Sequence, residues 1–351
     1  TVNTNGAYNS VSAASGNDKV TAAGGYNTIS IGDGVNNVTA SGGYNKITTG
    51  TGNDTIKADG GGNEIHAGDG VNTITANGGA NVIYSGSAID TVTAAGAANV
   101  IDAGAGNNNI TAWGGGNGVT TGAGDDDILV GGGINVVLAG DGNNDIDAYG
   151  GANGITTGSG DDDILAIGGA NVVVSGGGAD DIIMLGGVNG SYSEDGNDFI
   201  LAGGGGNAVI DTGGDNLILT GGAVNVVAVG EADNTIGMLG YTNILAAGDG
   251  DNLVAAAGFY NVMLMNGGGN TIGVVGQANV IADTAGDNTI VAVGQANIVM
   301  TELSGLAEVA GEGGMSLIGG AVGDVVGDDA EEAVDTAASK IDDLVIAGSG
   351  Q

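Results

Sequence analysis

Gly50-Thr51-Gly52-Asn53-Asp54-Thr55-Ile56 is the stretch that decides the fold, because the rest of the chain repeats its pattern. Every ninth residue from Asn9 to Asn297 is Asn or Asp, at 33 positions (297/9) without exception. Two residues after each of them stands Val, Ile, Leu or Met, and Ser191 is the one exception. Self-similarity at a short, fixed period is typical of a solenoid, in which each repeat packs on its neighbours.

The composition limits the partners that the chain can have. Its 351 residues include 77 Gly, no Pro, no Cys and no Arg, and the formal net charge is −37. Such a charge argues against nucleic acid or an anionic membrane surface and favours divalent cations. The absence of Cys excludes disulfides and thiolate sites. No run of 18 apolar residues is present, so we expect no membrane insertion.

Two kinds of nonapeptide alternate, so the full repeat has 18 residues. One reads Gly-Gly-x-Asn-x-Ile, as at 42–47, and the other Gly-x-Gly-x-Asx-x-Ile, as at 158–164. Each predicts a Gly-rich turn followed by a short strand whose central Val or Ile points inward. The expected fold is all-β: a right-handed parallel β-solenoid (β-roll) of about 16 coils over residues 1–299, with two sheets around a Val/Ile ladder.

The Gly-x-Gly turns resemble the repeats-in-toxin (RTX) family, whose consensus is Gly-Gly-x-Gly-x-Asp-x-U-x with U a large apolar residue. The resemblance covers about residues 1–300, although the first Gly of the consensus pair is missing from these turns. It implies a calcium-binding β-roll and extracellular or cell-surface localisation after type I secretion. The family includes toxins, proteases, lipases, adhesins and surface-layer proteins. The closest matches are Gly50–Ile56, Gly104–Ile110, Gly122–Ile128, Gly140–Ile146 and Gly158–Ile164.

The same resemblance implies calcium ligands along one edge of the solenoid, where turn carbonyls and Asp carboxylates supply the oxygens that Ca²⁺ prefers. The alternative is that these Asp residues only cap turns on a solvated face. We favour calcium, because carboxylates stacked at the spacing of one coil would repel each other without a cation. The opposite edge has Asn in place of the acid and predicts an Asn ladder that bonds backbone without metal. The candidate ligands are Asp18, Asp54, Asp90, Asp126, Asp162, Asp180 and Asp198, and, where the family's Asp position holds Asn, Asp33, Asp69 and Asp141 three residues earlier.

The outward strand positions change along the chain. Early coils carry polar residues, as in Asn37-Val38-Thr39, whereas later ones read Val136-Val137-Leu138, Phe199-Ile200-Leu201 and Leu217-Ile218-Leu219. Strands that are apolar on both faces imply a covered outer face. We expect partner subunits to cover it; the alternative is that the C-terminal tail folds back over it.

The register changes toward the C-terminus. Residues 1–214 follow the RTX-like pattern, and 215–299 are divergent coils with weaker or absent calcium sites. We expect 300–351 to form a cap or tail with a helix near 329–345, where an apolar stripe recurs at helical spacing. The acidic-then-aliphatic residues 342–346 resemble a type I secretion signal. At the N-terminus Val2 already fits the inward column, so the sequence begins inside a strand. We expect either that it was cut from a longer protein or that a neighbouring molecule pairs with this first strand.

Catalytic equipment is sparse in this sequence. His66 is the single histidine, and it is expected at an outward strand position beside Ile65 and Glu64. General acid–base catalysis needs a second positioned group and a cleft, and the pattern predicts neither. We therefore expect no enzyme.

These observations predict a calcium-binding structural subunit that self-assembles into an extracellular filament, surface layer or matrix fibre. One alternative is an ice-binding or adhesin-type ligand-binding surface built on the pairs Thr73/Thr75 and Thr91/Thr93, which thermal hysteresis of a dilute monomer would reveal. The other is a secretion or folding module of a larger secreted enzyme.

Overall fold

The computed structural model describes residues 1–283, 286–301, 306–310 and 316–317, and every regular element in them is a β-strand. The helix predicted near 329–345 lies outside the described residues. The chain forms two compact units, Thr1–Glu194 and Asp195–Gln351.

The strands of the first unit are β1 (Val2–Ala13), β2 (Lys19–Ile31), β3 (Asn37–Thr48), β4 (Thr55–His66), β5 (Thr73–Tyr84), β6 (Thr91–Gly104), β7 (Asn109–Thr121), β8 (Asp127–Leu138), β9 (Asp145–Thr156), β10 (Asp163–Val174) and β11 (Asp181–Ser193). Those of the second unit are β12 (Phe199–Asp211), β13 (Leu217–Val229), β14 (Thr235–Ala247), β15 (Leu253–Ala257), β16 (Tyr260–Met265), β17 (Thr271–Val275), β18 (Ala278–Asp283), β19 (Thr289–Val293), β20 (Ala296–Thr301), β21 (Leu306–Ala310) and β22 (Ser316–Leu317).

Each unit is a parallel β-solenoid of 18-residue coils, as the sequence predicts. In the first unit one strand makes one coil, from β1 to β11, and neighbouring strands pair in parallel at an offset of 18 residues, as in Ile56 opposite Ile74. In the second unit β12, β13 and β14 each make a coil, and the pairs β15–β16, β17–β18 and β19–β20 make three more. The nine-residue period ends at Val299. Parallel pairing nevertheless continues beyond it, as the pairing of β21 with β19 shows.

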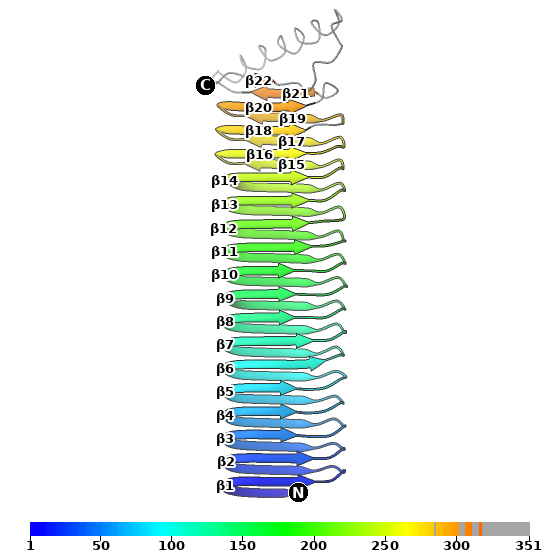
Figure 1. Ribbon diagram of the computed structural model, residues 1–351, viewed down its shortest axis with the longest axis vertical. Coiled ribbons are helices and arrows are strands. Elements are labelled where there is room, and N and C mark those ends of the chain that lie inside the picture. Colours follow the sequence, from blue (N-terminus) through cyan, green and yellow to red (C-terminus); the bar gives the residue numbers. More distant parts are fainter. Residues whose placement is uncertain (284–285, 302–305, 311–315, 318–351) are drawn as a thin grey trace, which may run out of the picture. The chain divides into compact units, whose positions relative to one another are not determined.

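Every coil has two edges, which Figure 1 shows for each unit: tight bends along one and protruding loops along the other. We call them the bend edge, formed by pairs such as Gly42-Gly43, and the turn edge, formed by loops such as residues 50–54. Through β14 the backbone keeps strand geometry around the bend, so one long strand serves both sheets. Glycine is required there, since a Cβ on Gly60 would lie 2.1 Å from the carbonyl oxygen of Gly42 in the preceding coil.

The core between the two sheets is the predicted Val/Ile ladder, with Ala beside it. Ile56, Ala58 and Ile65 are at most 1% exposed, and the same positions are buried in the coils that follow. Outward positions alternate with them, which gives the repeating buried–exposed pattern of each strand.

An Asn ladder closes the bend edge, and it too is as predicted. Asn153 Nδ2 donates to Asn171 Oδ1 in the next coil at 2.7 Å and to the backbone carbonyl of Ile167 at 3.1 Å. Asn135 Nδ2 in turn donates to Asn153 Oδ1 at 2.8 Å. Because these amides are buried, each coil depends on its neighbours to satisfy its polar groups.

Ala88 stands where every other described turn except that of Ala232 places a glycine. Its φ is 105°, close to the values at Gly52 (137°) and Gly70 (132°), and a Cβ disfavours this region. We expect Ala88→Gly to raise the free energy of unfolding by about 1 kcal/mol, measured by urea denaturation. Ala105→Gly, at a turn position without a positive φ, should have the opposite sign because it only adds unfolded-state entropy. Equal effects of the two substitutions would contradict strain at Ala88.

Candidate functional site

The turn edge carries a column of inward-facing Asn and Asp side chains at multiples of 18. Asn36 shows what an Asn does there: Oδ1 accepts the backbone N–H of Asp18 at 3.0 Å, and Nδ2 donates to the carbonyls of Gly32 and Gly34, both at 3.1 Å. One amide thus ties two coils together and closes its own turn. Asn72, Asn108 and Asn144 repeat this arrangement.

An Asp in the same column makes only half of these bonds. Asp54 Oδ1 accepts the backbone N–H of Asn36 at 2.8 Å, which matches the role of Asn Oδ1. In the Asn coils the corresponding atom is the amide nitrogen, which donates to two turn carbonyls, whereas Oδ2 of Asp54 can only accept. The Oδ2 atoms of Asp54, Asp90, Asp126 and Asp162 are buried without a hydrogen bond of ordinary geometry.

The carboxylates of this column are separated by amides. Asp54, Asp90, Asp126 and Asp162 are 36 residues apart, with an Asn in each intervening coil, so roughly 10 Å separates one from the next. Within the first unit only Asp162 and Asp180 stand in consecutive coils, where Asp162 N–H donates to Asp180 Oδ1 at 2.9 Å. The repulsion between adjacent coils that the sequence analysis invoked therefore acts at one pair and is weakened elsewhere.

Burial raises the pKa of Asp90, Asp126 and Asp162 above its usual value. Hydrogen bonding opposes the rise, from the Asn72 backbone at Asp90 and from the hydroxyls of Thr121 and Thr157 at Asp126 and Asp162. The neutral form of these carboxyls, or a bound cation, would remove the cost of an ionised oxygen in this place.

The candidates Asp33, Asp69 and Asp141 lie in a different column, exposed on the outside of the turn. Their Oδ1 atoms accept the backbone N–H of Thr51, Ser87 and Ser159 in the next coil, at 2.8 to 3.0 Å. These bonds and those from the hydroxyls of the same residues, of which the Ser87 hydroxyl is the larger cause at Asp69, hold the pKa of each carboxyl below its usual value. The candidate ligands therefore do not form a single set: those of the turn column are buried from Asp54 onward, and Asp33, Asp69 and Asp141 are exposed.

The remaining two candidates lie at different depths. Asp18 is half-buried, whereas Asp198 in the second unit is buried and its N–H donates to Asn216 Oδ1 at 2.7 Å. From Asn216 to Asn288 every member of the column is Asn, so the divergent coils contribute no carboxylate to it.

A second acidic column, which the sequence analysis did not consider, lies on a sheet face of the first unit. Asp127, Asp145, Asp163 and Asp181 are paired in register across β8 to β11, at the first outward position of each strand. Burial, followed by the charges of neighbouring Asp residues, raises the pKa of Asp145 and Asp163. Their spacing of 18 residues is visible in the sequence, but each stands one residue after the turn column, at the start of a strand and outside the RTX-like turn pattern.

His66 lies outward beside Ile65, as predicted, and belongs to a surface network. Glu64 accepts hydrogen bonds from Lys46 Nζ at 2.6 Å and from the Tyr44 hydroxyl at 2.5 Å, and His66 Nε2 lies 3.2 Å from the same carboxylate. These partners, Lys46 first, hold the pKa of Glu64 at about 2. His66 stacks on Tyr84 with ring centroids 4.7 Å apart. Both carboxylate oxygens of Glu64 therefore bond to side chains of the preceding coil.

Among the described residues no three acidic or imidazole side chains are grouped closely enough to bind one metal ion between them. The same part of the chain contains no helix of a length and hydropathy suited to crossing a bilayer. Comparison with protein-family models, curated proteins and solved structures finds no match to this chain.

Proposed function

We propose that this chain is an RTX-type β-roll: a secreted, non-enzymatic, calcium-binding structural subunit of an extracellular assembly. The observation that supports calcium binding is the buried Oδ2 atom of Asp54, which has no hydrogen-bond partner of ordinary geometry. A hard cation turns this cost into coordination, since it takes carboxylate and carbonyl oxygens together.

The ligands at each site would come from one Asp and its own turn. At Asp54 these are Oδ2 and the carbonyls of Gly50 and Gly52, with water or the neighbouring turn completing the shell. A site with one carboxylate is weak, and extracellular calcium modules bind at about 10⁻⁴–10⁻³ M. The Asn coils need no ion, because Nδ2 already satisfies their turn carbonyls. Calcium would then add stability outside the cell, where it is abundant.

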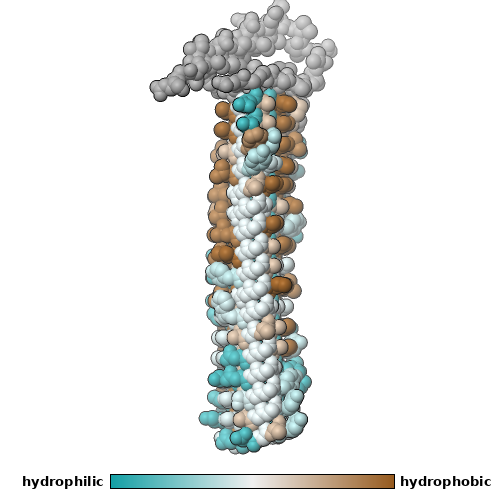
Figure 2. All heavy atoms as spheres, turned by 90° about the vertical axis from the view of Figure 1, so that its left-hand side faces the viewer, coloured by the Kyte–Doolittle hydropathy of each residue, from teal (hydrophilic) through white to brown (hydrophobic). Residues whose placement is uncertain are grey.

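The proposed role as a subunit of an assembly is supported by the distribution of charged residues. In the described part of residues 195–301 the acids of the second unit fall in or beside the turn edge, whereas Glu308 stands within β21. Figure 2 shows hydrophobic columns flanking the bend edge there, whereas the first coils of the first unit are hydrophilic. Copies of a highly acidic chain can approach each other through such faces without opposing like charges. The charge-free segments are 199–210, 217–229, 235–247, 253–265, 271–282 and 289–301.

Calcium titration of chelator-treated protein tests the proposal. We expect millimolar calcium to raise the melting temperature, and equimolar magnesium to do so much less because Mg²⁺ demands a near-octahedral shell. Asp54→Asn should remove part of the gain, since it supplies the missing donor, whereas Asp33→Asn in the exposed column should leave it unchanged. Negative-stain microscopy of the same samples reports on assembly. A melting temperature that does not change with calcium would overturn the calcium sites. Dispersed single particles at high protein concentration would overturn the role as an assembly subunit.

A further inference from the structure

One sheet face of the second unit has an ordered pattern of large and small side chains. The face consists of 199–203, 217–221 and 235–239 in β12, β13 and β14, and of the strands β15, β17 and β19. Three outward columns run across its six coils, and the two nearer the bend line the hollow described below. Column one is Leu201, Leu219, Gly237, Ala255, Gly273 and Val291. Column two is Gly203, Gly221, Leu239, Ala257, Val275 and Val293.

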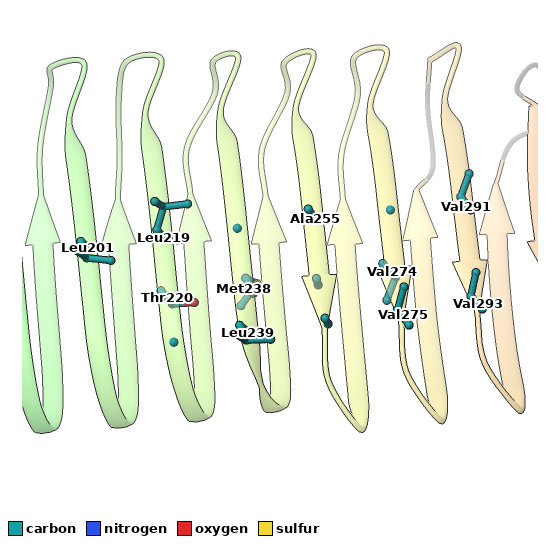
Figure 3. A pocket seen from close by; sticks show the side chains of 15 residues that line it. Leu201, Leu219, Thr220, Met238, Leu239, Ala255, Val274, Val275, Val291 and Val293 are labelled. Carbon is teal, nitrogen blue, oxygen red and sulfur yellow. The ribbon is translucent and has the colours of Figure 1, made fainter.

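Within a coil, a large residue in one column accompanies a glycine in the other. This holds for Leu219 with Gly221, for Gly237 with Leu239, for Gly273 with Val275, and again in the coil of Leu201. The result is a shallow hollow of about 630 Å³ over the glycines. Figure 3 shows its walls changing sides: Leu201 and Leu219 lie at one level along the strands, whereas Leu239 and Val275 lie nearer the bend.

The walls of this hollow are open to solvent. Leu239 is 67% exposed and Val275 56% exposed. A Cβ on Gly221 would meet no atom within 4 Å, so the space above that glycine is vacant in the monomer. Apolar side chains this exposed, arranged in consecutive coils, form a patch that isolated proteins rarely keep uncovered.

We propose that a second copy of this chain docks on this face through a two-fold axis parallel to the direction in which the coils stack. That operation keeps the coil order and reverses the strands, so column one of one copy meets column two of the other. Leu219 then enters the space above Gly221 of the second copy, Leu239 that above Gly237, and Val275 that above Gly273. The match is isologous, as a two-fold interface requires.

The alternative two-fold axis, parallel to the strands, reverses the coil order and sets each column against itself. It also brings large against small in four of its six contacts, as at Leu219 with Gly273, but it sets Leu201 against Val291 and Gly237 against Ala255. The double variant Leu219→Gly/Gly221→Leu distinguishes the two axes, because only the first axis places those two positions opposite each other. The first axis pairs large with small in four of the six coils and equal residues in the other two, at the spacing of about 10 Å at which sheets pack.

The dimensions of the face set the expected strength. Six coils at about 4.8 Å and five strand residues at about 3.3 Å give roughly 29 by 16 Å, or about 460 Å² of projected area per copy. This lies at the low end for specific association, so we expect a weak, concentration-dependent dimer. The six coils carry no charge, because residues 199–210, 217–229 and 235–247, and β15, β17 and β19, contain no charged residue; Glu308 in β21 stands one coil beyond them, opposite Val291. The inference rests on the proposed self-assembly of the chain and not on the proposed calcium binding.

Sedimentation equilibrium from micromolar to millimolar protein, in calcium and in chelator, tests this interface. We expect the wild type to dimerise and Gly221→Leu to weaken the dimer by at least about tenfold, since two leucines then compete for one space. The double variant Leu219→Gly/Gly221→Leu exchanges the columns in that coil and should restore the wild-type dissociation constant. Ala208→Leu places a leucine on the opposite face and should leave the dissociation constant unchanged.

Failure of this interface can be told apart from failure of the proposed function. Assembly that Gly221→Leu leaves untouched would keep the subunit role and overturn this face. A double variant as weak as the single one would overturn the symmetry proposed here. A wild type that stays monomeric overturns both. If Gly221→Leu instead destabilises a monomer, the chain's own C-terminal segment covers the hollow, and the second copy is the wrong occupant.

Discussion

Asn153→Ala is expected to lower the free energy of unfolding by about 3–5 kcal/mol, the largest effect of any single substitution considered for this protein. The substitution removes the acceptor of Asn135 Nδ2, the donor to Asn171 Oδ1 and the donor to the Ile167 carbonyl. Asn171 Oδ1 is then left buried without its donor, and a buried polar group without a partner costs about 1–3 kcal/mol. A cavity inside the bend adds to the loss.

Asn109→Ala provides the matched control for the ladder. Asn109 is exposed on a sheet face and donates one hydrogen bond, to Asp127 Oδ2 at 3.1 Å. We expect it to change stability by no more than about 0.5 kcal/mol. Urea denaturation, with hydrogen exchange of the amides in β9 and β10, measures both variants. A loss below about 1 kcal/mol at Asn153 would show that solvent reaches the ladder and that the coils do not depend on it.

Asp126→Asn is expected to stabilise the protein by about 1–3 kcal/mol at neutral pH without divalent cations. The amide keeps the Oδ1 acceptor of the Asn108 N–H, now at 2.8 Å, and supplies an Nδ2 donor to the turn carbonyls of residues 122 and 124. Asn108 and Asn144 in the flanking coils already make such bonds. Replacing a buried carboxylate by an amide is therefore a gain wherever no cation is bound.

The pH dependence of this gain has a definite sign. Because burial raises the pKa of Asp126, the folded state binds the proton more tightly than the unfolded state does. The wild type is then most stable below the unfolded pKa of about 3.9 and loses stability as the pH rises through the raised folded value. The advantage of Asp126→Asn should shrink as the pH falls from 7 toward 4. Groups with lowered pKa values, such as Glu64 at about 2, lose their contribution only at more acidic pH.

Asp125→Asn removes the same charge from the neighbouring position, which is exposed. It should give little change at any pH, which separates burial from net charge. If Asp126→Asn destabilised the cation-free protein at pH 7, the ionised carboxylate would have to be stabilised by a partner within the fold, and the reasoning behind the calcium sites would fail with it.

Much of the candidate site could be anticipated from residue types and spacing. The Asn and Asp columns, the inward Val/Ile ladder and the Asn ladder of the bend all follow from a period of nine, because a strand presents a given face to its neighbour only if the repeat is kept. The division of the candidate carboxylates into the turn column and an exposed column could not be foreseen. Asp33 and Asp54 differ by three residues in turn position, and which way each points depends on the path of the turn between them.

The sequence by itself determined the parallel β-solenoid, its 18-residue coil and the identity of its buried columns. These are local and periodic properties, because a residue type repeated at a fixed interval packs against the same residue type in the next coil. Only the tertiary structure decided that an Asn amide closes its own turn while an Asp leaves an oxygen without a donor. It also decided that large and small residues of one sheet face form two complementary columns. Both depend on distances between atoms in different coils, which residue spacing alone does not specify.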